Sequence, residues 1–298
     1  MPRVPETSPL WSKSEQEIKQ VVSSVRAGRD LTPSGWPDDA SVAVALTFDV
    51  DSETVAIWNG QHSPSTFSRG EYGVRVGLPR ILRLLTKHQV SATFYVPGMT
   101  AVLHPDVACQ ITDCGNHEVG LHGWIHESIT ELAREDEFQL TEQAFRFWAD
   151  QLGHPPTGIR TPSWDFTSAT IDIIQKLGLR YDSSLMADDR PYELLSYEKP
   201  TGIVELPVDW KLDDYMYFHI DYERGYRPYI KPADVLEIWR AEFDMALQEG
   251  TVFILTMHPQ IIGHRSRIVI INELIEYMKD RGAWFATMDE IARYVQPL

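Results

Sequence analysis

Long apolar runs and cysteines are both scarce in this chain of 298 residues. No apolar run approaches the roughly 18 residues that a membrane-spanning helix needs, and residues 1–10 lack the apolar core of an export signal. The two cysteines, Cys109 and Cys114, form neither a redox pattern nor a zinc-binding pattern. They are expected to be buried free thiols in a reducing compartment. These absences predict a soluble, cytoplasmic protein.

Positive charge is also in short supply. The chain has 27 Lys and Arg residues against 43 Asp and Glu residues, which gives a net charge of −16. A field of this sign repels nucleic acids and anionic membranes, so neither is expected as a partner. Apolar residues make up 43% of the chain and charged residues 23%, as in ordinary globular proteins. The length suits one barrel-sized domain or two smaller domains.

Strand-like and helix-like segments alternate along most of the chain. Strands are expected at residues 42–48, 91–96, 117–121, 158–160, 179–182, 203–208, 251–257 and 283–287. Helices are expected at residues 14–27, 76–87, 105–114, 129–152, 168–177, 232–250 and 265–282. The strands are apolar throughout, which is typical of a parallel sheet with both faces covered. The pattern predicts an α/β fold with a single distorted (β/α) barrel of about seven parallel strands over residues 41–298, and an N-terminal extension, residues 1–40, that packs on it.

Residues 183–231 interrupt this alternation. The segment is rich in Pro and Tyr, and the strand at 203–208 is the only regular element expected in it. Its irregularity predicts a barrel that is incomplete or distorted. Its Trp and Tyr content, with no obvious core role for all of it, predicts a subunit interface and therefore a homo-oligomer.

Three polar clusters follow apolar strand-like runs. In Asp49-Val50-Asp51, the period-two alternation of a strand places both carboxylates on the same side. His122 and His126 lie four residues apart, so their imidazoles face together across one helical or helix-like turn. His258 follows the strand at 251–257. Because α/β folds collect their active-site loops at strand ends, the three clusters are expected to converge.

Two imidazoles and one carboxylate form a metal-ligand set that leaves coordination positions open for water and substrate. Such a set is typical of a hydrolase more than of a structural site. Each cluster alone has a plainer explanation, since Asp-x-Asp is often a turn or a helix cap and ten histidines give some spacings of four by chance. A non-catalytic barrel that binds a ligand stays open as an alternative. A serine hydrolase is disfavoured because the chain has no Gly-x-Ser-x-Gly turn.

Four motifs resemble, in their order and spacing, those of the polysaccharide deacetylase family. They are Asp49-x-Asp51, His122-x-x-x-His126, Arg160-Thr161-Pro162-Ser163-Trp164 and Leu255-Thr256-Met257-His258. The resemblance spans residues 40–295. It implies a distorted (β/α) barrel that removes acetyl groups from N-acetylated sugars with one divalent metal ion. The motifs are specific for the family and not for its substrate.

The resemblance also implies a role for each matching residue. Asp51, His122 and His126 would hold the metal. Zinc suits this set, although iron, cobalt or manganese can occupy it as well. Asp49 would be the general base, and Arg160 would pair with it.

On the leaving-group side, the resemblance makes His258 the general acid that protonates the departing amine. Asp209 is a candidate charged partner for this histidine. Trp164 and Trp210 would line the substrate cleft.

One departure from the family pattern concerns the first motif, which usually has two adjacent aspartates. Here Val50 intervenes, as in a minority branch that includes peptidoglycan deacetylase-like proteins and relatives of cyclic-amide hydrolases. The departure leaves open which of Asp49 and Asp51 is the base and which is the ligand.

The substrate also stays open between two classes. One is an N-acetylated glycan, for example peptidoglycan. The other is a small cyclic amide, imide or ureide of the kind that allantoinase-like and imidase-like enzymes hydrolyse. The segment Ile261-Ile262-Gly263-His264-Arg265-Ser266-Arg267 resembles the small-amide branch, and the missing export signal also favours it, because cell-wall glycan lies outside the cytoplasm.

Overall fold

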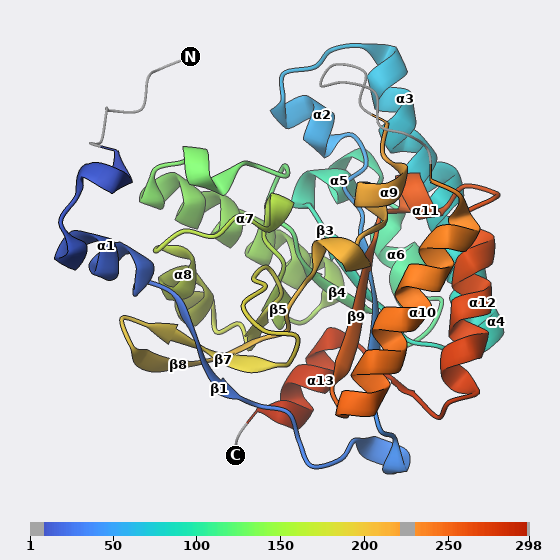
Figure 1. The fold of residues 1–298 in the computed structure, drawn as a ribbon. Coiled ribbons are helices and arrows are strands. Elements are labelled where there is room, and N and C mark those ends of the chain that lie inside the picture. The colour runs from blue at the N-terminus through green and yellow to red at the C-terminus, as the bar shows by residue number, and fades with distance from the viewer. Residues whose placement is uncertain (1–8, 221–229, 297–298) are drawn as a thin grey trace.

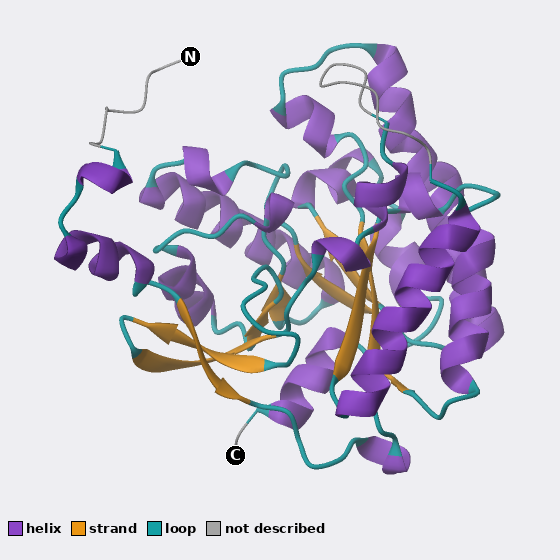
Figure 2. Cartoon of the chain, in the orientation of Figure 1, coloured by secondary structure: helices purple, strands orange, loops and turns teal. Residues whose placement is uncertain are grey.

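The computed structural model describes residues 9–220 and 230–296, and one curved sheet organises them (Figures 1 and 2). Its parallel strands are β2 (Ala43–Asp49), β3 (Thr93–Val96), β4 (Glu118–Leu121), β5 (Gly158–Ile159), β6 (Tyr181–Asp182), β8 (Lys199–Glu205), β9 (Val252–Met257) and β10 (Trp284–Phe285). The order is β8-β6-β5-β4-β3-β2, with β9 and β10 both paired to β2. The prediction of a distorted (β/α) barrel is confirmed, with eight parallel strands among the described residues instead of about seven.

The barrel wall is irregular between β8 and β9. No pairing joins these two strands within the described ranges. Residues 210–218 contact β9 there, with one isolated parallel bridge from Asp213 to Thr256. Two antiparallel strands, β7 (Tyr192–Ser196) and β1 (Arg26–Asp30), extend the sheet outward from β8. The irregular segment 183–231 is therefore where the barrel departs from regularity, as its sequence predicts.

Helices surround the curved sheet (Figure 1). They are α1 (Glu15–Val22), α2 (Thr54–Trp58), α3 (Pro64–Tyr72), α4 (Leu78–His88), α5 (Gly98–Leu103), α6 (Val107–Thr112), α7 (Arg134–Leu152), α8 (Thr170–Leu177), α9 (Asp214–Phe218), α10 (Pro232–Glu249), α11 (Pro259–Ile262), α12 (Ile268–Lys279) and α13 (Met288–Val295). Short 3-10 turns occur at η1 (Leu10–Ser12), η2 (Pro37–Asp39), η4 (Ile129–Glu131), η5 (Pro162–Trp164) and η6 (Trp210–Leu212), and η3 (Gly73–Gly77) is a π-helical turn. None of the helices in the described ranges is long and apolar enough to cross a membrane.

The two faces of β2 show how the strand positions the site. Val44, Leu46 and Phe48 belong to the core between sheet and helices, whereas Ala43 and Ala45 belong to a second core inside the barrel. The second core includes Met288, Ile291, Ala292 and Val295 of α13, so this helix closes the end of the barrel where β2 begins. Thr47 and Asp49 continue the inward face towards the other end, because side chains alternate along a strand. The open, carboxyl end of the barrel is therefore free for a polar site.

The N-terminal segment differs from its predicted structure. The helix expected at 14–27 ends at Val22, and Arg26 and Ala27 lie in β1. The cause is non-local, since β1 pairs with β7, a strand that the sequence pattern missed. Of the predicted extension 1–40, β1 thus joins the sheet and Trp36 packs against the rings of Trp284 and Tyr294, while α1 has no buried residue.

Two further expectations need correction. Cys109 and Cys114 are exposed and not buried, because α6 turns Val107, Ala108 and Ile111 towards the core instead. Helix α13 was not predicted, although a capping box formed by Thr287 and Glu290 marks its start.

Histidine 117 gives the fold a testable pH dependence. Its Nδ1 accepts the backbone N–H of Ala92, and its Nε2 is buried without a partner among the described residues. Burial lowers the pKa of His117 from 6.5 to about 4. As the pH falls from about 6.5 to about 4, the unfolded chain therefore binds a proton here that the folded chain does not, and stability falls. Urea unfolding of wild type and His117→Asn should show a steeper loss in this window for wild type, and parallel curves would contradict the assignment.

Candidate metal and catalytic site

The carboxyl ends of four parallel strands bring the predicted site residues together. Asp49 ends β2, His122 follows β4, Arg160 follows β5 and His258 follows β9. Asp51 lies two residues beyond the end of β2, and the intervening Val50 packs into the helix-facing core. The two aspartates therefore share the inward side, as the alternation predicts.

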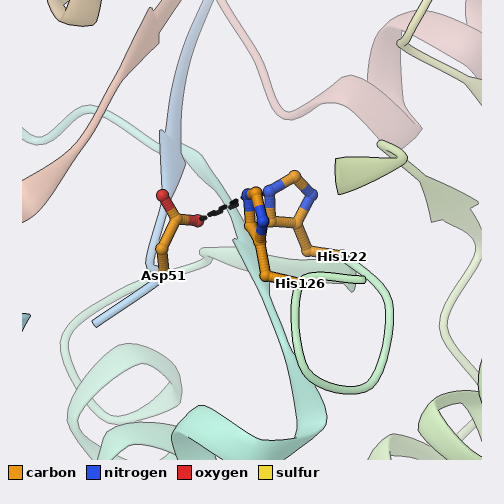
Figure 3. Close-up of side chains that lie close together, drawn as sticks. All are labelled: Asp51, His122 and His126. Atoms are coloured by element: carbon orange, nitrogen blue, oxygen red, sulfur yellow. Dashed lines mark ion pairs between the residues drawn. The ribbon is translucent and has the colours of Figure 1, made fainter. Parts of the chain in front are cut away.

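The three predicted metal ligands form one cluster (Figure 3). Oδ1 of Asp51 lies 3.4 Å from Nε2 of His122 and 3.9 Å from Nε2 of His126, and the ligand atoms all lie within 4.8 Å of one another. His122 is fixed from behind, because its Nδ1 donates to the carbonyl of Arg160 at 2.7 Å. That bond leaves Nε2 as the ring nitrogen that faces Asp51, as in a metal-ligating histidine.

The segment from His122 to His126 is a turn and not a helix. Gly123 and His126 both have left-handed backbones, with φ of 68° and 57°. The turn is held by Glu127, whose buried carboxylate accepts the backbone N–H groups of Trp124 and Ile125 at 2.8–3.1 Å. A Cβ on Gly123 would lie 2.8 Å from this carboxylate, so glycine is required there. Glu127 is a structural member of the site that the sequence analysis missed.

Burial, hydrogen bonding and pKa shifts in the cluster of Asp51, His122 and His126 also suit a divalent cation, independently of the sequence motifs. Oδ1 of Asp51 is buried and accepts no hydrogen bond from the described residues, while Oδ2 accepts one from Gln260 at 3.3 Å. Burial raises the pKa of Asp51, but the neighbouring histidines lower it overall, so this carboxylate is ionised. Burial also lowers the pKa of His126 to about 4, which leaves its ring neutral at pH 7. A buried anionic oxygen without a donor, beside a neutral imidazole, suits a bound metal ion.

Arg160 and Asp49 form a buried ion pair beside this cluster. Nη1 of Arg160 donates to Oδ1 of Asp49 at 2.8 Å, and neither side chain is more than 2% exposed. The guanidinium lies 4.3 Å above the ring of Tyr95, and it also donates to Thr47 and twice to Ser183. Oδ2 of Asp49 is left facing Nε2 of His122 at 4.0 Å. One oxygen of Asp49 is thus anchored and the other borders the ligand cluster.

The charged partner of His258 is Asp214, and the proposal of Asp209 is wrong. Nδ1 of His258 donates to Asp214 at 2.7 Å, and the backbone N–H of His258 donates to the same carboxylate at 3.0 Å. Asp209 instead caps η6 and pairs with Lys211. Burial alone would lower the pKa of His258, but Asp214, Asp213 and Asp51 raise it well above its usual value. Sequence could not single out Asp214, because it lies in the irregular segment that only folding brings against β9.

Asp213, Asp214 and His258 also lie close enough to hold a metal ion. Three of the four carboxylate oxygens in this cluster already accept N–H groups, however. Both oxygens of Asp214 accept N–H groups of His258, and Oδ1 of Asp213 accepts the N–H of Tyr215 at 2.8 Å. The second cluster is therefore assigned to holding a protonated imidazole and the first to holding metal.

The predicted cleft residues Trp164 and Trp210 stack on each other. Their ring centroids lie 4.3 Å apart, and Trp210 is 45% exposed whereas Trp164 is 9% exposed. Trp164 lies in the turn that directly follows Arg160, with a left-handed backbone. Contact of the two rings with substrate stays a prediction.

Comparisons with known proteins agree with this geometry. Residues 38–181 match the model of the polysaccharide deacetylase family. The chain is 31% identical to a peptidoglycan deacetylase of Helicobacter pylori, over 84% of this chain and 95% of that protein. It is 26% identical to a peptidoglycan deacetylase-like protein of Gibberella zeae, over 88% of each.

Solved structures show the same likeness. A putative polysaccharide deacetylase from Mycobacterium smegmatis is 34% identical, with a TM-score of 0.82 over 91% of this chain and 95% of that one. An allantoinase shares the fold, with a TM-score of 0.75 over 90% of this chain and 97% of that one, at 24% identity. The site geometry and the two relatives above 30% identity lead to one conclusion: the chain is a hydrolase that belongs to the polysaccharide deacetylase family.

Proposed function

We propose that the chain is a metal-dependent deacetylase that hydrolyses the acetamide of an N-acetylated glycan, with peptidoglycan as the substrate class and zinc as the metal. The proposal rests on two groups beside the cluster of Asp51, His122 and His126. One is the Asp49 carboxylate, which Arg160 holds, and the other is the His258 imidazole, which Asp214 holds. The Helicobacter pylori relative, itself a peptidoglycan deacetylase, supports the choice of substrate.

Asp51, His122 and His126 would hold the metal. When bound there, a divalent ion would act as a Lewis acid towards the acetamide carbonyl and lower the pKa of the attacking water. Zinc is proposed because two imidazoles and a carboxylate match its donor preference and leave a position open. Gln260 donates to Oδ2 of Asp51, whereas His122 and His126 face Oδ1.

The proton transfers belong to residues of the chain. Asp49 takes a proton from the attacking water through Oδ2, while Arg160 holds Oδ1 and compensates the charge. His258 donates its Nε2 proton to the nitrogen of the leaving sugar amine, and Asp214 holds the opposite ring nitrogen in place. The carbon–nitrogen bond breaks, and the products are acetate and a free amine. The base lies beside a guanidinium, whereas the carboxylates beside the acid raise the pKa of His258.

The substrate proposal has a direct test. Acetate release should be measured with peptidoglycan and N-acetylglucosamine oligomers, and ring opening with allantoin and a cyclic imide. Acetate is expected from the glycans alone. Ring opening without acetate release would move the chain to the small-amide class, and tight glycan binding without turnover would make it a binding barrel.

Metal binding should depend on the two histidines of the cluster. Elemental analysis of purified protein should find about one transition-metal ion per chain, and His126→Ala should lose most of it because one of three ligands is gone. His122→Ala should behave in the same way. His154→Ala, which removes an exposed histidine, is the matched control and should keep the metal. Full metal content in both cluster variants would refute the ligand assignment.

Substitution of each aspartate should show that Asp49 is the base and Asp51 a metal ligand. Asp49→Asn should keep the metal and lower kcat by about 10²–10⁴-fold, the usual contribution of a general base. Asp51→Asn should lose metal first, because it removes the charged ligand. The two variants make the same chemical change two residues apart, so each controls the other. Metal loss in Asp49→Asn with metal retained in Asp51→Asn would mean that Val50 has exchanged the two roles.

Assembly as a homo-oligomer remains our proposal. Two aromatic side chains of the irregular segment, Tyr197 and Trp210, are 51% and 45% exposed, which suits an interface. Residues 221–229, which contribute further tyrosines to the segment, lie outside the described residues.

A further inference from the structure

We propose that Asp182 and Glu205 form a proton-sharing carboxyl pair that positions the catalytic base through Arg160. The pair touches neither the ligand cluster nor the base, and it acts through the Ser183–Ser184 turn. The inference rests on the proposed function in one respect, that Asp49 is the group whose position matters for turnover.

The two carboxyl groups meet because of strand register. Asp182 ends β6 and Glu205 ends β8, and the two residues are direct partners in this parallel pairing. Both side chains are fully buried, at 0% exposure. Neither has a basic side chain as a hydrogen-bond partner among the described residues. Two acids buried together without a basic hydrogen-bond partner are costly to retain, which argues for a specific role.

The oxygens of the pair are used almost completely by one turn. Oε1 of Glu205 accepts the backbone N–H groups of Ser184 and Leu185, at 3.0 and 2.9 Å. Asp182 accepts the backbone N–H of Ser184 at 2.9 Å and its hydroxyl at 3.0 Å. The backbone N–H of Ser184 therefore donates to both carboxyl groups.

One oxygen of the pair has no donor, and this indicates where the shared proton lies. Oε2 of Glu205 is buried and accepts no N–H or O–H from the described residues. Strand register pairs the two residues, and both carboxyl groups accept the backbone N–H of Ser184, so the two groups lie side by side. A proton held between them would give Oε2 the partner that it lacks. Burial raises the pKa of Asp182 to about 6. Burial and the charge of Asp182 raise the pKa of Glu205 well above its usual value, so one proton stays on the pair at neutral pH.

The turn held by the pair is the one that holds Arg160. The carbonyl of Ser183 accepts Nε of Arg160 at 3.0 Å, and its hydroxyl accepts Nη2 at 2.9 Å. The hydroxyl of Ser184 accepts the backbone N–H of Thr161 at 2.9 Å. The remaining edge of the guanidinium points to Asp49. A shift of the turn therefore moves the guanidinium and the base with it, and a displacement of about 1 Å in a reacting group can cost about 100-fold in rate.

Two substitutions at Glu205 separate positioning from packing. Glu205→Gln keeps the Oε1 acceptor and replaces the shared proton with an amide N–H that can donate to Asp182. Glu205→Ala removes both functions. We expect Glu205→Ala to lower kcat by about 10–100-fold with KM and metal content unchanged, and Glu205→Gln to stay within about threefold of wild type.

A matched control is Glu137→Ala. Glu137 is also a buried carboxylate, and it accepts the hydroxyls of Thr167 and Thr170 at 2.7 and 2.6 Å, with no contact to Arg160. Its loss should lower Tm without a selective loss of kcat. In an Asp49→Asn background, Glu205→Ala should have no further effect on kcat, because the group that it positions is already gone.

A second readout needs no substrate. The Nε–H signal of Arg160 in an NMR spectrum of the metal-loaded protein should be resolved and slow to exchange in wild type and in Glu205→Gln, and weakened or exchange-broadened in Glu205→Ala. If Glu205→Ala does not fold, Ser184→Ala takes its place and should lower kcat about tenfold, since it removes the hydroxyl that joins Asp182 to the backbone N–H of Thr161.

The outcomes are distinguishable. An unchanged Arg160 signal in a folded Glu205→Ala protein, or an equal loss of kcat in the Asp49→Asn background, would overturn the positioning role. Wild-type protein that releases no acetate from any N-acetylated glycan would overturn the proposed function instead, and the NMR comparison would still test the pair.

Discussion

The buried ion pair between Arg160 and Asp49 is the interaction on which the site depends. Removing two charges from water is costly, and the attraction between them offsets that cost only when the remaining donors and acceptors are satisfied. Here Thr47, Ser183 and the face of Tyr95 complete the guanidinium's surroundings. Because these partners lie on or directly after different strands, the pair forms only when the sheet assembles and curves, and it couples the position of the base to the fold.

Asp49 and His258 lie in opposite electrostatic environments, which suits one to act as the base and the other as the acid. A guanidinium adjoins the carboxylate of Asp49, whereas carboxylates surround the imidazole of His258, whose pKa they raise. Between them, Asp51 keeps one buried oxygen that accepts no hydrogen bond from the described residues. A carboxylate held by a guanidinium, an imidazole held by a carboxylate and an anionic oxygen suited to a metal ion thus lie within a few side chains of one another.

Local patterns in the sequence predicted what depends on local geometry. The alternation along β2 placed Asp49 and Asp51 on one side, and the strand ends gathered the motifs into one site. Contacts made by the irregular segment 183–231 could not be predicted in this way. Asp214 as partner of His258, the β1–β7 pairing and the Asp182–Glu205 pair all depend on register between distant strands, or on a loop whose path is set by packing. Helix α13 is different, since the capping box of Thr287 and Glu290 is a local sequence signal for its start.

A crystal structure of the metal-loaded protein, with anomalous scattering recorded at the metal edge, would show whether Asp51 holds the metal, and not Asp49 or the Asp213–Asp214–His258 cluster. We expect one anomalous peak bonded to Asp51, His122 and His126, with Asp49 still paired to Arg160. A peak bonded to Asp49, or one between Asp213, Asp214 and His258, would contradict this expectation.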